Sequence, residues 1–266
     1  MRLSISHQTI YRYDQPVQYA LQQVRLTPKT RQGQTILDWK IEVEGGKEEL
    51  RFDDHHNNRV LLVSSDPEST QLVISASGTV ETNDTSGITG RHGGYAPLWF
   101  FLRQTELTKP GPLIRKLVKS LDTPEAEGVA KLHALSSLIA EQVTYQSGQT
   151  ATDTTAEEAL STGAGVCQDH AHVFLSAARL LNFPARYVSG YLMLNDRVEQ
   201  DASHAWVEVH VEGLGWVGFD ISNGISPDER YVPVATGLDY NETAPVSGMR
   251  FGDSSESMIV SLQVQQ

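Results

Sequence analysis

The sequence contains one cysteine, few basic side chains and no long apolar run, and each shortage excludes a class of protein. A single cysteine among 266 residues cannot form an internal disulfide, so packing must hold the fold together. No apolar run is long enough to cross a membrane as a helix. The opening residues, MRLSISHQTIYRY, lack the charged and apolar regions of a secretory signal, so we expect a cytoplasmic protein.

Basic residues are outnumbered, and this argues against two kinds of partner. The chain has 33 acidic and 21 basic side chains, for a net charge of −12. Nucleic acids and anionic membranes both attract clustered Lys and Arg, so we expect neither as a partner. The length predicts one or two domains with a sizeable core.

The first 85 residues have the pattern of an all-β domain. Apolar residues alternate with polar ones in short runs, of which Leu37, Trp39, Ile41 and Val43 are an example, and Gly, Asp and Asn separate the runs. This pattern predicts a sandwich or a small antiparallel sheet. His55 and His56 fall in one of the polar turns, where we expect solvated side chains rather than metal ligands.

A glycine-rich stretch, GITGRHGG at residues 87–94, is the best candidate for a domain boundary. We therefore predict a β-rich domain over residues 1–85 and a second domain over residues 86–266. The second domain begins with helical patterns. One helix opens at Pro112 with an apolar face (Leu113, Leu117 and Leu121), and another runs from about Pro124 to Val143 with Thr123 as its N-cap.

The stretch around the cysteine is the most informative in the chain. It reads STGAGVCQDHAHVFLSAARLLNFPARYVSGYL from Ser161 to Leu192. Apolar residues after Cys167 recur at helical spacing, so Cys167 is predicted at the first turn of a helix entered from a glycine bend. Unpaired N–H groups and the helix dipole at that point favour a thiolate. The alternative is that Cys167 is simply a small buried side chain.

A predicted β-hairpin follows the helix and carries a histidine and an aspartate. Residues 202–211 (ASHAWVEVHV) alternate, with His204, Trp206, Glu208 and His210 on one face, and Gly213–Gly215 is a turn signal. If the hairpin turns near residue 212 or 213, Asp220 on the return strand lies almost opposite His204. Cross-strand neighbours are close enough for a carboxylate to bind an imidazole.

A thiol at a helix N-terminus and a His–Asp pair are the components of a Cys-His-Asp triad. Cys167 would attack an acyl carbon, His204 would transfer the proton and Asp220 would orient the imidazole, with a thioester as intermediate. The backbone N–H of Cys167 is the natural first oxyanion donor. Trp206 and Gln168 are candidate substrate-binding residues and could supply a second donor.

Nearby histidines allow a metal hypothesis, which the spacing disfavours. On a helix, His170 lies near Cys167 but His172 points roughly the other way, and no fourth ligand is evident. We therefore expect no metal and no cofactor. His172 is predicted to pack inside, while His170 or Asp169 could line the site.

Four segments, GVCQDHAHVF, PARYVSGYL, DASHAWVEV and GWVGFD, resemble the bacterial transglutaminase-like superfamily, a branch of the papain-like cysteine proteases. HQTIYRYDQPVQYALQQVRLTP resembles the β-rich N-terminal region found ahead of that core. The resemblance implies an α+β, papain-like core, in which a helix bearing Cys packs on an antiparallel sheet bearing His and Asp, after an all-β N-terminal domain. It assigns the triad to Cys167, His204 and Asp220. One departure is the Ile-Ser-Asn after Asp220, where relatives usually have Pro-Thr-Asn.

These features predict a cysteine-dependent acyl-transfer enzyme for a peptide or protein amide, with residues 86–266 as its catalytic domain. Hydrolysis is favoured, because water needs no second binding site. The alternatives are a transglutaminase with an amine acceptor, a catalytically silent interaction module, and a structural role through the edges of the N-terminal sheets.

Overall fold

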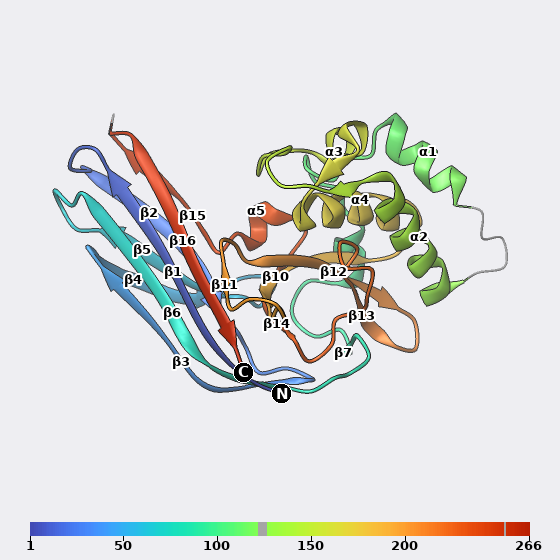
Figure 1. Cartoon of the computed structure of the whole chain (residues 1–266), viewed down its shortest axis with the longest axis horizontal. Coiled ribbons are helices and arrows are strands. Elements are labelled where there is room, and N and C mark those ends of the chain that lie inside the picture. The colour runs from blue at the N-terminus through green and yellow to red at the C-terminus, as the bar shows by residue number, and fades with distance from the viewer. Residues whose placement is uncertain (122–126, 253) are drawn as a thin grey trace.

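The computed structural model describes residues 1–121, 127–252 and 254–266, and it shows a β-sandwich beside an α+β unit (Figure 1). The sandwich has a five-stranded sheet in the order β11-β16-β1-β6-β3 and a four-stranded sheet in the order β15-β2-β5-β4. Its strands are β1 (Arg2–Tyr13), β2 (Tyr19–Thr27), β3 (Gln34–Glu44), β4 (Gly46–Asp53), β5 (Arg59–Ser65), β6 (Gln71–Thr82), β11 (Glu199–Gln200), β15 (Val246–Phe251) and β16 (Glu256–Gln265).

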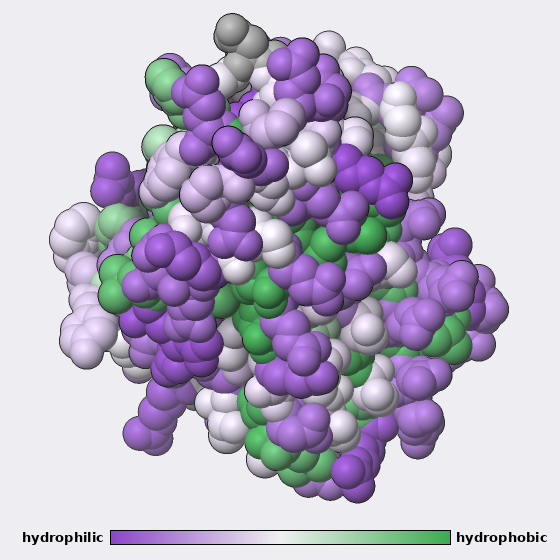
Figure 2. Space-filling model, turned by 90° about the vertical axis from the view of Figure 1, so that its left-hand side faces the viewer, coloured by the Kyte–Doolittle hydropathy of each residue, from purple (hydrophilic) through white to green (hydrophobic). Residues whose placement is uncertain are grey.

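Alternation along the strands produces the sandwich core, as the sequence predicted. In β1, every second residue is buried, because successive side chains of a strand point to opposite faces. Tyr11 and Tyr13 of β1, Leu72 and Ile74 of β6 and Val63 of β5 belong to one buried cluster between the two sheets. Figure 2 shows the side of the molecule formed by the sandwich as mainly hydrophilic, with hydrophobic residues in small groups.

The last two strands join the sandwich, although the sequence-based division placed them in the second domain. β16 pairs antiparallel with β1 along its whole length, and β15 pairs with β2. The alternating pattern of β16 correctly indicated a strand, with Leu262 and Val264 buried. Such a pattern does not specify which sheet a strand joins, because every antiparallel sheet offers similar backbone partners.

The α+β unit contains a second sheet, in the order β14-β10-β12-β13-β7, and the helices that cover it. These strands are β7 (Ile88–Gly90), β10 (Ala185–Leu192), β12 (His204–Val211), β13 (Gly215–Phe219) and β14 (Tyr231–Gly237); β8 (Thr144–Tyr145) and β9 (Ala164–Gly165) form a separate parallel pair. The helices are η1 (Leu98–Leu102), α1 (Pro112–Ser120), α2 (Gly128–Gln142), α3 (Ala156–Thr162), α4 (Cys167–Leu180) and α5 (Tyr240–Thr243). No helix in the described part of the chain is long and apolar enough to cross a membrane.

Helix α4 is the centre of this unit. Eleven of its fourteen residues are buried, and it packs on β10 and β12 and against α1, α2 and α3. Val173, Phe174 and Ala177 share a core with Val207 of β12 and Phe219 of β13. The predicted α+β, papain-like arrangement of a cysteine-bearing helix on an antiparallel sheet is therefore confirmed.

The two preceding helices differ from the prediction in detail. Helix α1 buries Ile114 and Leu117, whereas Leu113, which we expected on the buried face, is 37% exposed. The stripe from Ile114 through Leu117, Val118 and Leu121 is the wider apolar face, and it is the one that packs. Helix α2 buries Leu132, Ser136 and Ile139. Its predicted start at Pro124 and the predicted cap Thr123 lie outside the described residues.

A buried ion-pair network joins the sandwich to the α+β unit. Arg31, between β2 and β3, donates to Glu208 of β12 at 2.7 Å, and Arg186 of β10 donates to the same carboxylate at 2.7 Å. Burial opposes the charge on Glu208, but the two guanidinium groups outweigh it and lower the pKa of the carboxyl to about 2. Since a buried charge without partners is very costly, this network fixes how the two parts pack.

We expect Glu208→Gln to lower the free energy of unfolding by about 3 to 5 kcal/mol, because it leaves two buried guanidinium groups without their counter-ion. Urea denaturation at neutral pH would measure this. Glu42→Gln is the matched control, since Glu42 pairs with Lys40 on the surface and both are more than 60% exposed; its effect should stay within about 0.5 kcal/mol. Equal effects of the two substitutions would contradict the importance of the buried network.

Candidate active site

A tight bend places Cys167 at the first position of α4. Gly163 ends α3 with a φ of 72°, a conformation that glycine adopts without strain. The Asp169 carboxylate folds back to accept a hydrogen bond from the Val166 N–H at 2.7 Å, which satisfies one unpaired donor of the helix N-terminus. At Gly165, a Cβ would lie 2.6 Å from the Asp169 side chain, so only glycine fits there.

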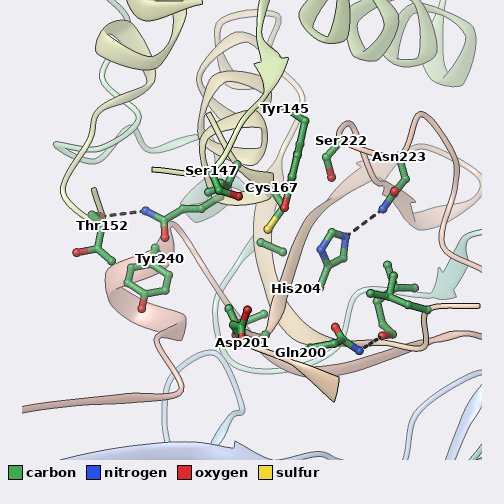
Figure 3. Close-up of a pocket in the computed structure, with 18 of the residues that line it drawn as sticks. Tyr145, Ser147, Thr152, Cys167, Gln200, Asp201, His204, Ser222, Asn223 and Tyr240 are labelled. Carbon is green, nitrogen blue, oxygen red and sulfur yellow. Dashed lines mark hydrogen bonds between the residues drawn. The ribbon is translucent and has the colours of Figure 1, made fainter. Parts of the chain in front are cut away.

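Cys167 and His204 line the same cavity, of about 710 Å³, and the sulfur lies on the same side of it as the imidazole (Figure 3). His204 is the first residue of β12, and its imidazole lies close enough to Cys167 for the thiol to raise the pKa of the ring. The cavity is lined by Tyr145, Ser147, Thr152, Val166, Cys167, Gln168, Tyr187, Ser189, Leu192, Leu194, Arg197, Gln200, Asp201, Ala202, Ser203, His204, Ala205, Ser222, Asn223 and Tyr240.

The hairpin brings Asp220 to His204, but diagonally. The register pairs Val207 with Phe219, which places Asp220 level with Trp206 and centres the turn on residue 213. His204 and Asp220 share a face, and His204 Nε2 donates to Asp220 Oδ2 at 2.6 Å. Because Nε2 is used by the carboxylate, Nδ1 is the ring nitrogen left for the thiol.

The Asp220 carboxylate is completely buried and fully hydrogen-bonded. Oδ2 also accepts from the Tyr231 hydroxyl at 2.8 Å and from Asn223 Nδ2 at 2.7 Å. Oδ1 accepts from the Ser222 hydroxyl at 2.8 Å and from the Asn223 N–H at 3.1 Å. The Ile-Ser-Asn segment therefore retains what Asp220 needs, since Ser222 supplies a hydroxyl just as threonine would.

Electrostatics favour a charged pair at this position. Burial opposes the charge on His204, but hydrogen bonds with Asp220 and Cys167 outweigh it and raise the pKa of His204 to about 10. Burial likewise opposes the charge on Asp220, yet the hydrogen bond from His204 and its positive charge lower the pKa of Asp220 to about 2. An imidazolium bound to a carboxylate is thus the stable form over the neutral range.

The two predicted substrate-binding residues lie in different places. Gln168 lines the cavity, where its Nε2 donates to the Thr152 carbonyl at 3.0 Å. Trp206 is only 1% exposed, and its ring lies behind the His204 ring at a centroid distance of 6.1 Å with an interplanar angle of 27°. Trp206 belongs to a buried cluster with Val188 and Tyr231, so its side chain does not line the cavity. At the site it contacts the His204 imidazole.

Tyr145 is a cavity residue that the sequence analysis missed. The parallel pairing of β8 with β9 sets Tyr145 level with Gly165, two residues before Cys167, and its ring stacks on His170. In Figure 3 its hydroxyl points toward the sulfur. Burial and then the charge on Cys167 raise the pKa of Tyr145. Sequence alone gave no signal, since residues 145–153 had the composition of an exposed loop.

The remaining histidines have structural partners. His170 and Asp169 are both buried, so neither lines the cavity as we had considered. The two ring nitrogens of His170 lie 2.9 and 2.8 Å from the carbonyl oxygens of Val166 and Val143, which accept hydrogen bonds from the ring. His172, fully buried as predicted, lies beside Tyr187.

The turn between β4 and β5 contains His55 and His56, and one of them differs from the prediction. The expectation that both of its histidines are solvated is wrong for His56, whose side chain is 1% exposed and bonds Glu242 of α5 at 2.7 Å. His55 is exposed, and the three side chains are the only group of potential metal ligands found among the described residues. Glu242 already accepts hydrogen bonds from His56 Nε2 and from the Leu238 N–H, whereas the buried Nδ1 of His56 has no hydrogen-bond partner among the described residues.

Comparison with known proteins identifies the family. A family model described as the transglutaminase-like superfamily matches residues 114–221, and one described as the bacterial transglutaminase-like N-terminal region matches residues 3–81. The chain belongs to the transglutaminase-like superfamily. Its fold and family are those of papain-like cysteine enzymes, which agrees with the resemblance found in the sequence.

Relatives of this superfamily member align along its whole length. A crystal structure of a candidate cysteine protease from Cytophaga hutchinsonii has a TM-score of 0.78 at 25% identity and covers 100% of this chain and 91% of its own. An uncharacterized protein of Mycobacterium leprae is 26% identical, covering 99% of this chain and 98% of its own length. One from Mycobacterium tuberculosis is 28% identical, covering 97% and 90%. The sandwich and the core are therefore found together in these relatives.

The His204–Asp220 pair should make stability depend on pH at both extremes. The pKa of His204 is raised, so its contribution to the free energy of unfolding is complete below the ordinary pKa of 6.5. That contribution is lost as the pH rises toward about 10. Asp220 has a lowered pKa, so its contribution is complete above 3.8 and is lost as pH falls toward about 2. Urea denaturation across this pH range should show both losses of stability. Asp220→Asn should reduce the loss between pH 6.5 and about 10.

Asp228→Asn is the matched control, because Asp228 forms a partly exposed ion pair with Arg230 rather than with a histidine. It should leave the alkaline slope unchanged. An Asp220→Asn variant that loses as much stability between pH 6.5 and 10 as the wild type would contradict the assigned coupling.

Proposed function

We propose that this protein is a cysteine-dependent acyl-transfer enzyme that hydrolyses a peptide or another amide. The observation that carries the proposal is the hydrogen-bonded His204–Asp220 pair beside Cys167 in an open cavity. A buried His–Asp pair with only a structural role would not need a thiol in contact with the imidazole, nor a route from solvent to that thiol.

The proposed reaction has two halves. The Cys167 thiolate forms a bond to the carbonyl carbon, and His204 gives its proton to the nitrogen as the C–N bond breaks, which releases the amine and leaves a thioester. A water molecule then attacks the thioester carbon, His204 takes its proton, and the C–S bond breaks to release the acid and restore the thiolate. Asp220 keeps Nε2 occupied, so Nδ1 performs both proton transfers.

Two donors are available for the negative oxygen that develops on the carbonyl. The backbone N–H of Cys167 lies in the first turn of α4, where it has no helical partner. We propose the Tyr145 hydroxyl as the second donor, because it projects over the sulfur from the neighbouring β8 strand. The Gln168 amide, which also lines the cavity, already donates to the Thr152 carbonyl.

Water is the acceptor that the cavity favours. Its polar side chains, including Ser147, Ser203 and Asn223, surround the reacting groups, and Asp201 is the one acidic side chain among the described residues that line it, so the lining supplies a single carboxylate for an amine. Transglutamination remains the alternative acyl transfer, since it differs only in the acceptor. A silent interaction module would have no need for the five hydrogen bonds that hold Asp220 in place.

The thiol should react as a thiolate that depends on His204. We expect iodoacetamide to label the single cysteine well below pH about 8.5, the ordinary pKa of a free thiol, because the adjacent imidazolium stabilises the anion. Intact mass after labelling from about pH 4 to about pH 10 measures this. His204→Ala should move labelling up toward pH 8.5, while His210→Ala, at the far end of the same strand, should not. Labelling that rises only near pH 8.5 in all three would favour the silent module.

Turnover should depend on Cys167 and Tyr145 to different degrees. With denatured casein as substrate, Cys167→Ala should abolish the release of new amino groups, and Tyr145→Phe should lower kcat by about 100-fold or more through loss of an oxyanion donor. Tyr95→Phe is the control, since Tyr95 is 88% exposed. Incorporation of dansylcadaverine without new amino groups would show an amine acceptor instead. Full activity of Cys167→Ala would disprove the mechanism.

A further inference from the structure

Strand β16 has an open edge along more than half of its length. On the side away from β1 it pairs only with β11, through Gln263 and Leu262, and the Val264 N–H donates to the Val198 carbonyl at 3.2 Å. Within residues 1–121, 127–252 and 254–266, no strand pairs with that side of residues 256–261. Five of those six residues are exposed. An exposed edge of this kind is a template for a further strand.

The backbone groups on this edge can be assigned from the pairing. Since Val264 donates outward to Val198, and alternate residues of a strand direct their N–H and C=O groups to the same side, Val260 and Met258 also direct theirs outward. The groups of Ile259 are directed to β1, where it is level with Ile10. By the same alternation Glu256 is also outward, so the open edge offers three outward N–H and C=O pairs in succession.

The open edge begins at the cavity that holds Cys167. Strand β11 pairs with the end of β16. After β11, from Asp201 on, the chain turns away from β16 and continues to His204. Both Gln200 and Asp201 line the cavity. Figure 1 shows β11 beside β16 on the side that faces the α+β unit. A strand added to β16 in line with β11 would thus have one end next to the mouth of the cavity.

A second hollow lies at the far end of the same edge. It has a volume of about 380 Å³ and lies between β15 and the start of β16. Its lining is polar and contains both Arg250 and Glu256. Glu256 is in phase with Met258 and Val260, so side chains of an added strand on that face would point toward this hollow.

We propose that the open edge of β16 docks an extended segment of a polypeptide substrate by β-strand addition and presents the adjoining residues to Cys167. The proposal rests on the proposed hydrolysis of peptides. Backbone pairing gives affinity that is largely independent of sequence, and the hollow adds a preference for a polar side chain at one position. The six open residues span about 20 Å, which accommodates about six residues of an extended chain.

The position of the edge favours a substrate over a second copy of the chain. The edge is continuous with β11, whose residues form the cavity wall, so a strand placed there leads directly into the site. The α+β unit stands next to this edge in Figure 1. A single extended strand therefore reaches the edge more easily than the sandwich of a second copy would. This docking also gives the sandwich a role in substrate selection.

Binding can be tested without turnover. In the Cys167→Ala background, fluorescein-labelled denatured casein should bind, as measured by fluorescence anisotropy, and Val260→Pro should weaken it about tenfold by removing one outward N–H. The matched control is Ile41→Pro on β3, the opposite edge of the same sheet. The Thr82 N–H donates to the Met1 carbonyl, so the even-numbered residues of β6 direct their backbone N–H and C=O groups toward β1. Ile41 lies opposite Ala76, one of these residues, so the backbone groups of Ile41 point away from β6. The Ile41 N–H is therefore on the outer edge of β3.

Circular dichroism melting checks that both proline variants are folded, and Met258→Pro replaces Val260→Pro if the latter is not. Equal binding by the Val260→Pro and Ile41→Pro variants would overturn the docking proposal. So would a wild type that sediments as a dimer and becomes monomeric on Val260→Pro, since a second copy would then occupy the edge. Casein that binds through β16 but is not cleaved by the wild type would count against the proposed function and leave the docking intact.

Discussion

The buried carboxylate of Asp220 is the group on which the rest of the site depends. A charge without solvent is tolerated only when it is fully bonded, and here His204, Ser222, Asn223 and Tyr231 supply the donors. These donors come from β12, from the turn after β13 and from β14, so the sheet must be complete before the carboxylate is satisfied. The same bonds fix the imidazole that faces Cys167. Stability and the proposed chemistry therefore share one set of interactions.

The sandwich is tied to this site rather than merely attached to it. Arg31 reaches Glu208 in the middle of β12, the strand that begins with His204, and His56 bonds Glu242 beside the cavity residue Tyr240. The pairing of β11 with β16 adds a backbone connection to the cavity wall. Because these contacts come from three separate segments of the sandwich, the α+β unit is held in one position against it.

Local sequence patterns predicted most helices and strands. Alternation, helical spacing and glycine placement predicted most strands of the first 85 residues, helix α4 and the hairpin from β12 to β13, and the motifs predicted the family. Features that rest on contacts between distant segments were missed or misplaced. Tyr145 belongs to a two-residue strand, too short to leave a pattern, and His56 is buried only because α5 covers it. Of the C-terminal hairpin, the pattern of β16 indicated a strand but β15 fell in a segment with the composition of a loop, and both were assigned to the other part of the chain.

The sequence by itself determined most of the helices and strands, that Cys167 begins a helix, and that His204 and Asp220 belong to one hairpin, with Asp220 directly after its second strand. These are consequences of periodicity and turn chemistry, which act over a few residues. Tertiary structure alone decided the register that makes the His204–Asp220 contact diagonal, the burial of Trp206 behind the imidazole, and the return of β16 to the first sheet. The physical reason is that backbone hydrogen bonds between strands do not depend on sequence, so packing across the whole molecule selects among the possible pairings.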